Sequence, residues 1–515
     1  MNKKRSLNNS VALYSAKQIK QIEQEYAASS TRGTYPLMEK AGTALFKQLL
    51  LEWPHTKNII VVTGKGNNAG DGFVVARLAA ESRIKVIVCA LSETKLLTGD
   101  ALQAYQKIPH RNIKYLNLEQ VDFSASDIIV DAILGTGIKG KLVEDYLTAI
   151  KKINASSSPV VAVDIPTGVE ADTGFVHNDA IEADLTVSFV GHKKGMYTGD
   201  AAKFCGKVSL ESLDISQKFY DRQEFNLFTH TWQSIKHHLK ARDITSHKGQ
   251  FGHTTIIGGQ QGMAGAAILS ATAAARSGSG WTSAWVGKDC VGPLIGRIPE
   301  VMAQSIPEVE IKNKLCSELI SLPHLGRIFV VGPGLGEGSW GQRWITVLSE
   351  CESARSCRQV WDADALNLLA EFTDSASNRF NSHRVLTPHP GEAARLLKSS
   401  THSISQDRFN AAQSIAKQYG GVCVLKGNGT IIADEKGFQI VCPVGNPGMA
   451  SGGMGDVLAG LIGGLLAQGH SLMDAAILGV CIHGEAADKA AGRGEFYRGM
   501  LASDLFEYFP TLLNG

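Results

Sequence analysis

Two patterns of hydrophobic and polar positions alternate along most of the chain. Short runs rich in β-branched residues are typical of buried strands, and longer stretches with apolar residues three or four positions apart are typical of helices. The strand-like runs of the first half are 59–63, 85–90, 128–132, 160–164, 185–190 and 207–210. Because helical stretches separate these runs, the pattern predicts a parallel sheet with helices on its faces.

A second series of the same kind follows at 254–257, 282–286, 328–331, 360–363, 384–387 and 421–426. Residues 15–51 precede the first series with helical spacing, and we expect these helices to pack on the sheet or close over its site. The stretch 216–228 is polar and weakly periodic, which is typical of a boundary. We therefore predict an α/β protein in which residues 11–217 form a Rossmann-like three-layer α/β/α domain, 218–228 a linker and 229–515 a second α/β domain.

Composition narrows the classes of partner. The 515 residues include 51 Lys and Arg against 49 Asp and Glu, and no basic run is interleaved with aromatics, so we expect small-molecule partners and no nucleic acid. No apolar run approaches the roughly 20 residues of a membrane span, so we expect no membrane partner. The polar segment 1–10 lacks the apolar core of a secretory signal and is predicted to be a disordered tail. Nine cysteines without a Cys-x-x-Cys pair indicate reduced thiols and a cytoplasmic protein.

The run 446–460 is dense in glycine and brings one carboxylate to the start of an apolar helix. Gly452, Gly453 and Gly455 allow a close approach to a ligand, and the free N–H groups of a helix beginning near Asp456 attract anions. Asp456 as an ordinary helix-start acid is the alternative. Capping a helix does not require five glycines between 448 and 460, so we interpret Asp456 as a catalytic residue in a phosphate-handling site.

Other strand ends in the second half also carry unusual residues. The runs 258–266 and 332–336 are glycine-rich, and two prolines flank His389. Loops at strand ends carry function in parallel α/β sheets, so we favour a ligand contact for His389 over a purely structural role. Helix packing alone is an alternative for the alanines near 266, and a hairpin turn is an alternative for 426–430.

In the first half, 64–72 fits the G-x-G-x-x-A dinucleotide fingerprint, which is weak evidence alone, and we expect a helix at 73–80 after it. Asn67, Asn68 and Asp71 add polarity that this fingerprint does not require. Asp131 and Asp164 stand at two later strand ends. Either aspartate alone is explained by capping a turn, but three polar loops at the ends of one sheet favour a common site.

The second half resembles the carbohydrate-kinase (ribokinase-like) group and, more closely, the ADP-dependent NAD(P)H-hydrate dehydratase family. The resemblance rests on 247–253, 387–392, 426–430 and 446–460 and spans 229–515. It implies a ribokinase-like fold, ADP as cosubstrate, Mg²⁺, and Asp456 as the general base. The implied nucleotide-binding residues are Lys426, Gly427, Asn428, Gly429, Thr430 and Gly455. The residues implied to face the hydrated nicotinamide are Ala266, Gly336, His389 and Asp456.

The first half resembles the NAD(P)H-hydrate epimerase family through 37–42, 67–72, 131–137 and 164–168, over about residues 11–215. The implied substrate contacts are Asn67, Asn68, Ala69, Gly70, Asp71, Gly135, Thr136, Gly137, Ile138, Lys139, Gly140, Lys141, Tyr146 and Asp164. The implied K⁺ ligands are Asn68, Asp131 and Thr167, whose oxygens suit a hard cation. Ala69 and Thr167 depart from the usual glycine and serine of that family. We interpret Asp164 as the acid/base group of epimerisation.

Together the resemblances predict nicotinamide nucleotide repair: one half interconverts the R and S forms of hydrated NADH or NADPH, and the other dehydrates the S form at the expense of ADP. The products would be NAD(P)H, AMP and phosphate, and we expect a homo-oligomer. The alternatives are a vitamin-precursor kinase with an N-terminal nucleotide sensor, and a first half that only binds or scaffolds. The sequence leaves open ADP against ATP and NADH against NADPH.

Overall fold

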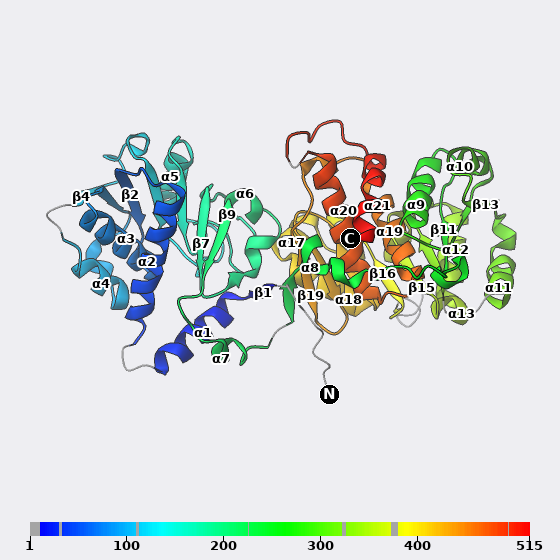
Figure 1. The fold of residues 1–515 in the computed structure, drawn as a ribbon, viewed down its shortest axis with the longest axis horizontal. Helices are drawn as coiled ribbons and strands as arrows, with labels where there is room; N and C mark the ends of the chain where they lie inside the picture. Colours follow the sequence, from blue (N-terminus) through cyan, green and yellow to red (C-terminus); the bar gives the residue numbers. More distant parts are fainter. Residues whose placement is uncertain are drawn as a thin grey trace. The chain divides into compact units, whose positions relative to one another are not determined.

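The computed structural model describes residues 11–29, 33–109, 113–224, 226–321, 326–371, 380–492 and 494–515. The predicted tail 1–10 lies outside these residues. The described chain divides into two compact units, one formed by Ala12–Leu227 and the other mainly by Phe228–Gly515. Both contain a largely parallel sheet covered by helices (Figure 1), so the predicted α/β class is confirmed.

The N-terminal unit contains a seven-stranded parallel sheet in the order β4-β3-β2-β5-β6-β7-β9. Its strands are β2 (Asn58–Thr63), β3 (Lys85–Ala90), β4 (Ile113–Leu116), β5 (Ile128–Ala132), β6 (Val160–Val163), β7 (Leu185–Phe189) and β9 (Lys207–Glu211). Its main helices are α1 (Ala16–Ala28), α2 (Tyr35–Glu52), α3 (Asn67–Glu81), α4 (Gly99–Gln106) and α5 (Glu144–Asn154). Only β4 has no counterpart among the predicted strands.

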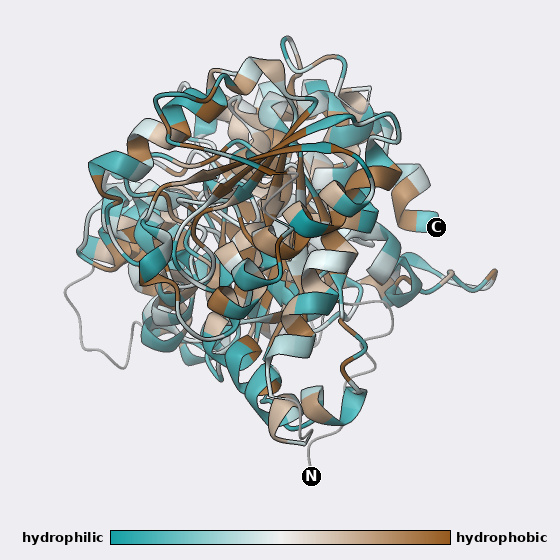
Figure 2. Ribbon diagram, turned by 90° about the vertical axis from the view of Figure 1, so that its left-hand side faces the viewer, coloured by the Kyte–Doolittle hydropathy of each residue, from teal (hydrophilic) through white to brown (hydrophobic). Residues whose placement is uncertain are grey.

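The alternation of side chains along β2 explains the layers of this unit. Val61 packs with α2 and α3, whereas Ile60 and Val62 pack with Ile150 of α5 on the opposite face. Because both faces are covered, the central strands are apolar throughout. Figure 2, in which this unit faces the viewer, shows hydrophobic strands and helices with mixed hydrophobic and polar surfaces.

In the C-terminal unit the strands follow the order β13-β12-β11-β14-β15-β16-β17-β18-β19, parallel as far as β17 and antiparallel from there to β19. The strands are β11 (His253–Ile257), β12 (Trp281–Val286), β13 (Met302–Ser305), β14 (Arg327–Val331), β15 (Arg358–Trp361), β16 (Arg384–Leu386), β17 (Val422–Leu425), β18 (Thr430–Asp434) and β19 (Gln439–Cys442). Residues 426–429 connect the antiparallel strands β17 and β18, and Thr430 is the first residue of β18, so the predicted alternative of a hairpin turn is confirmed.

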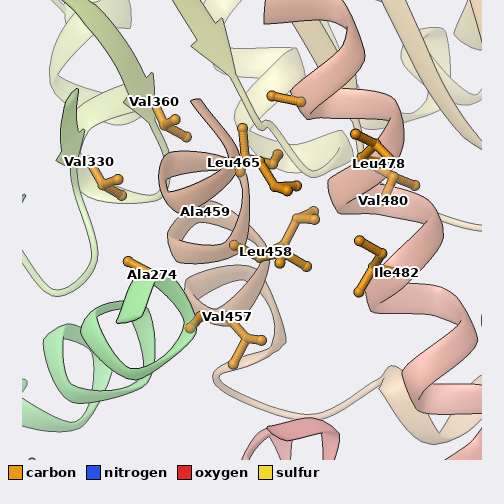
Figure 3. Close-up of a cluster of buried hydrophobic side chains, with 14 of the residues drawn as sticks. Ala274, Val330, Val360, Val457, Leu458, Ala459, Leu465, Leu478, Val480 and Ile482 are labelled. Carbon is orange, nitrogen blue, oxygen red and sulfur yellow. The ribbon is translucent and has the colours of Figure 1, made fainter. Parts of the chain in front are cut away.

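Three helices of this unit pack closely together: α9 (Ala264–Arg276), α19 (Met454–Ala467) and α20 (Leu472–Ala490). Figure 3 shows α19 between the other two, with Val457 and Leu458 among the buried apolar side chains. A Cβ atom on Gly460 would lie 2.0 Å from the carbonyl oxygen of Ser270 in α9. Gly460 therefore permits close helix packing, a role different from the ligand approach predicted for Gly452, Gly453 and Gly455.

The stretch predicted as a linker is folded in part. Gln217–Tyr220 forms α7, and Phe219 and Tyr220 are buried in the N-terminal unit. The ring of Phe219 meets Tyr26, and that of Tyr220 meets Tyr14, both edge to face. Two aromatic residues are too few to produce a visible periodicity, yet they bury enough apolar surface to hold the segment. In the described part of the chain no helix is both long and apolar enough to cross a membrane, and all nine cysteines are free thiols.

Candidate active sites

A cavity of about 990 Å³ opens at the carboxyl ends of β5 and β6 in the N-terminal unit. The predicted residues that line it are Asn67, Asn68, Asp71, Gly135, Thr136, Gly137, Ile138, Lys139, Gly140, Lys141, Tyr146 and Asp164. Helix α3 begins at Asn67 rather than at 73, so Asn67, Asn68 and Asp71 belong to its first turns and present side chains near its N-terminus. Ala69 and Gly70 are buried behind this surface and do not line the cavity.

Asp131 and Thr167 lie beneath the cavity and are fully buried. The Asp131 carboxylate accepts hydrogen bonds from the backbone N–H and the hydroxyl of Thr167, both at 2.7 Å. Burial raises the pKa of Asp131 to about 6, and these hydrogen bonds oppose the rise. The pair thus forms a compact oxygen-rich floor between the loops that follow β5 and β6.

Asn68 supplies the third oxygen predicted for K⁺. This residue is 8% exposed, and its side-chain amide nitrogen is buried without a hydrogen-bond partner in the described structure. A Cβ atom on Gly135 would lie 3.3 Å from the Asn68 Oδ1 atom, so the backbone of the loop after β5 lies against this amide. A 180° turn of the amide exchanges its oxygen and nitrogen. These residues therefore fit a monovalent cation held by oxygen atoms.

Asp164 follows β6 in the left-handed region, with φ of 66°, which L-residues adopt rarely. Strand β6 thus ends one residue earlier than predicted. The Oδ1 atom accepts a hydrogen bond from the Phe189 N–H at 2.9 Å and pairs with the ammonium of Lys193, whose side chain is fully buried. Oδ2 has no hydrogen-bond partner among the described residues and remains available at the cavity.

Several cavity residues have no counterpart in the sequence-based prediction. Helices α1 and α2 pack on the sheet, as one of the two predicted arrangements has it, and they contribute Lys20, Glu23 and Met38 to the cavity lining. Burial raises the pKa of Glu23 to about 7 and that of Asp71 well above its usual value, and the charge of Asp164 adds to both shifts. The signal that could have revealed Glu23 is a carboxylate beside the apolar stripe of α1, next to Ile22.

In the C-terminal unit, the three neighbouring parallel strands β15, β16 and β17 end at the same edge of the sheet. Asp362 follows β15, Thr387 follows β16 and Lys426 follows β17. The Lys426 ammonium lies 2.6 Å from Asp362 Oδ1, and the Thr387 hydroxyl donates to the same oxygen at 2.8 Å. Burial alone would lower the pKa of Lys426, but Asp362 and Glu392 outweigh it and raise that pKa. A cation is therefore fixed at this edge of the sheet.

Asp456 lies in the first turn of α19 and is half-buried. The helix is preceded by Gly453, whose φ of 91° lies in the left-handed region that favours glycine. A Cβ atom on Gly455 would lie 3.1 Å from the Lys426 Nζ atom, so this glycine leaves the start of the helix open beside the lysine. Burial, followed by the charge of Asp362, raises the pKa of Asp456 to about 7, although Lys426 opposes the rise.

His389 caps α16 (Pro390–Leu396), which gives this residue a structural role. Its Nδ1 atom accepts hydrogen bonds from the backbone N–H groups of Gly391 at 3.0 Å and Glu392 at 3.3 Å, so the ring proton is on Nε2. Burial, followed by the charge of Lys426, lowers the pKa of His389. Half of the side chain is exposed, which leaves the ring able to contact a ligand as well.

The remaining predicted residues surround this edge. The Gly336 N–H donates to Asp364 at 2.8 Å, and the charge of Asp364 also acts on Asp456. Ala266 in α9 lies against the loop that contains Gly334 and Gly336. A Cβ atom added to Gly334 would lie 3.2 Å from the Cβ atom of Ala266. Gly427, Asn428 and Gly429 form the hairpin connection directly after Lys426, and Thr430 begins β18. Asp362 and Asp364 were absent from the prediction, although the sequence Asp-Ala-Asp after a strand could have revealed them.

No group of three or more His, Cys, Asp or Glu side chains within the described ranges is arranged to hold a metal ion. A divalent cation at the C-terminal site would thus depend on ligand oxygens in addition to one or two carboxylates.

Comparison with known proteins gives the same division of the chain. Residues 254–511 match the family described as NAD(P)H-hydrate dehydratase, and residues 34–195 match the family described as YjeF-related protein N-terminus. The bifunctional NAD(P)H-hydrate repair enzyme Nnr of Coxiella burnetii is 41% identical over 98% of this chain and 99% of its own. The enzyme of the same name from Escherichia coli is 39% identical over 97% and 93%. The chain belongs to the bifunctional NAD(P)H-hydrate repair enzymes.

Among solved structures, a ribokinase-like superfamily protein from Enterococcus faecalis is 28% identical over 56% of this chain and 95% of its own, with a TM-score of 0.49. The ADP/ATP-dependent NAD(P)H-hydrate dehydratase of Bacillus subtilis, co-crystallised with ATP and Mg²⁺, is 28% identical over 55% and 96%, with a TM-score of 0.48. In this member of the repair-enzyme family, the residues named by the epimerase resemblance lie in the N-terminal unit, and those named by the dehydratase resemblance lie in the C-terminal unit.

Proposed function

We propose that the C-terminal unit dehydrates the S form of hydrated NADH or NADPH with ADP as the phosphoryl donor. Asp456 takes the proton of the ring hydroxyl while that oxygen attacks the terminal phosphorus of ADP, and AMP leaves. The ring nitrogen then expels phosphate, and loss of a proton from the neighbouring carbon restores the dihydronicotinamide. The products are NAD(P)H, AMP and phosphate.

The observation that carries this proposal is the environment of Asp456. A carboxylate with a pKa of about 7 is suited to accept a proton near neutral pH, and it stands beside the fixed ammonium of Lys426 and the open helix start at Gly455. The ammonium and the N–H groups of α19 would stabilise the transferred phosphoryl group. Lys426, Gly427, Asn428, Gly429, Thr430 and Gly455 would hold the nucleotide, and Ala266, Gly336 and His389 would face the nicotinamide. Mg²⁺ bound to the nucleotide would neutralise phosphate charge.

For the N-terminal unit we propose epimerisation of the hydrate in the 990 Å³ cavity, with Asp164 as an acid/base group. The strained backbone of Asp164 and its buried Lys193 partner support this role, because such positions persist where the surrounding structure holds a group for function. Asn68, Asp131 and Thr167 would hold K⁺, which would supply a fixed positive charge beneath the substrate. The loop 135–141, which lines the cavity, would contact the substrate.

The test uses the purified protein with mixed epimers of hydrated NADH, ADP, Mg²⁺ and K⁺. Absorbance near 340 nm, the ordinary NADH band, reports returning NADH, while chromatography reports AMP and both epimers. We expect complete recovery with one AMP per NADH. A stable phosphorylated product would favour the vitamin-precursor kinase, and recovery that stops after one epimer would leave the N-terminal unit as a binding module. Replacing K⁺ by Na⁺ tests the cation.

A further inference from the structure

Inversion of a carbon that carries a hydroxyl group requires a proton donor and a proton acceptor. Asp164 suits the acceptor, because its Oδ1 atom is held by Phe189 and Lys193 while Oδ2 is free at the cavity. One carboxylate cannot accept a proton on one side of the carbon and donate a proton on the other side in the same step. The proposed function assigns no partner to Asp164, so the donor must be sought among the other groups that line the cavity.

Apart from Asp164, three carboxyl groups line this cavity, and one of them, Asp100 of α4, accepts a hydrogen bond from the Thr34 hydroxyl. The other two are Glu23 from α1 and Asp71 from α3. Both are half-buried, and neither has a hydrogen bond or ion pair to the described residues. A carboxyl group without protein partners in a partly dry cavity resists ionisation, because burial penalises its charge. The cavity therefore contains one carboxylate fixed by a cation and two carboxyl groups that favour a proton.

Glu23 is better suited than Asp71 to exchange that proton. The pKa of Glu23 is raised to about 7, which allows loss and recovery of a proton near neutral pH, whereas the pKa of Asp71 is raised well above its usual value. The groups that act on Glu23 are Asp164, which raises its pKa, and Lys193 and Lys20, which lower it. The charge of Glu23 in turn raises the pKa of Asp71 and that of Tyr220.

We propose that Glu23 is the second acid/base residue of the epimerase site and works in opposition to Asp164. The inference rests on the proposed epimerase function. The Glu23 proton passes to the ring hydroxyl as the carbon–oxygen bond breaks, water leaves, and the ring nitrogen supplies the electron pair. A water molecule adds to the other face of the carbon and gives its proton to Asp164, and the nitrogen recovers its pair. The reverse reaction exchanges the two roles.

The experiment compares Glu23→Gln with wild type in the full-length protein and follows the interconversion of the separated epimers. Loss of a general acid costs about 10² to 10⁴-fold, so we expect at least a 100-fold lower epimerisation rate with unchanged dehydration of the S form. The matched control is Glu25→Gln on the same helix, because Glu25 pairs with Arg222 away from the cavity. We expect that control to epimerise at the wild-type rate.

The pH profile separates chemistry from packing. Epimerisation in either direction requires one proton on the pair Glu23 and Asp164, so the wild-type rate should fall as pH rises above about 7. The Glu23→Gln variant should lose this pH dependence. The Glu23→Asp variant should be slower than wild type but keep the pH dependence. An epimerisation rate in Glu23→Gln equal to that of wild type would overturn the inference. So would an Asp71→Asn variant that loses the pH dependence of epimerisation while Glu23→Gln keeps it. A wild-type protein without epimerisation overturns the proposed function instead.

Discussion

Neighbouring carboxyl groups have different environments in the C-terminal site. Asp362 is almost fully buried and receives hydrogen bonds from Lys426 and Thr387. Asp456 has no such partner among the described residues, and burial raises its pKa to about 7. Pairs of carboxyl groups whose environments shift their pKa values differently are typical of acid/base sites. Asp362 is thus suited to hold Lys426, and Asp456 to accept a proton.

Replacement of Asp456 by Asn tests its role directly. The amide preserves the shape of the side chain but cannot accept the proton, so we expect kcat of dehydration to fall about 10² to 10⁴-fold. Binding of ADP, measured by calorimetry, should remain within a few-fold of wild type, because Lys426 and the hairpin 427–430 are unchanged. Near-normal turnover in this variant would contradict the assignment.

The pH dependence of dehydration should follow the same residue. Asp456 must be ionised to act as a base, so kcat/KM should fall as pH decreases through about 7. Asp362→Asn removes a negative charge that raises this pKa and frees Lys426 to lower it further, so the acidic limb should move to lower pH. Thr387→Val is the control, since it removes a hydrogen bond to Asp362 without a change of charge. An acidic limb that stays in place in Asp362→Asn would disprove this coupling.

Sequence reasoning located most of these residues, because they stand directly after strands whose apolar pattern is clear. Asp164 and Lys426 are of this kind, whereas Asp456 was located by the density of glycine before an apolar helix. It could not locate Glu23 or Lys193, since their importance depends on which side chains they meet across the fold. Lys193 is 29 residues from its partner Asp164, and no local pattern marks such a pair.

At the scale of elements, glycine serves two purposes in and before α19. Gly453 and Gly455 shape the site, whereas Gly460, Gly463 and Gly464 allow α19 to approach its neighbours. A Cβ atom on Gly463 would lie 2.4 Å from Val330 in the sheet, and one on Gly464 would lie 1.9 Å from the Ser277 hydroxyl. The position of the catalytic helix therefore depends on close packing one to two turns away from Asp456.

Gly460→Ala tests this dependence. The added methyl group would meet the Ser270 carbonyl oxygen at 2.0 Å, and relief of such a clash in a packed core costs about 1–3 kcal/mol of unfolding free energy. We expect a lower thermal midpoint in calorimetry, together with slower dehydration and unaltered epimerisation. Gly265→Ala is the matched control, because a Cβ atom there meets nothing within 4 Å in a helix. That change should stabilise by about 0.5–1 kcal/mol. Equal midpoints for Gly460→Ala and wild type would contradict the packing argument.

The parallel strands were the most predictable elements, because burial on both faces makes them continuous apolar runs. Strands β4 and β13 were missed, since each has four residues and several polar positions. Helix α3 begins six residues before the predicted start because glycine and asparagine obscure a helical pattern that tertiary contacts nevertheless stabilise. Strands β18 and β19 escaped prediction because they follow a hairpin connection and pair antiparallel to the rest.

At the scale of the whole molecule, each unit has its own buried core and its own candidate site. A stereospecific dehydratase uses one epimer of the hydrate, so an epimerase in the same chain supplies it from the other. This chemical link does not by itself require transfer of the substrate between the sites without release. The two activities should accordingly be separable by single substitutions.

Mixing two variants tests that separation. Asp456→Asn should interconvert the epimers without forming NADH, and Asp164→Ala should form NADH from the S form and then slow to the rate of spontaneous epimerisation. An equimolar mixture should recover all of the hydrate, because a small molecule released by one protein diffuses to the other. The comparison is wild type at the same concentration of each active site, with NADH followed by absorbance. A mixture that stops where Asp164→Ala stops, although Asp456→Asn alone epimerises, would show that the hydrate passes between sites without release.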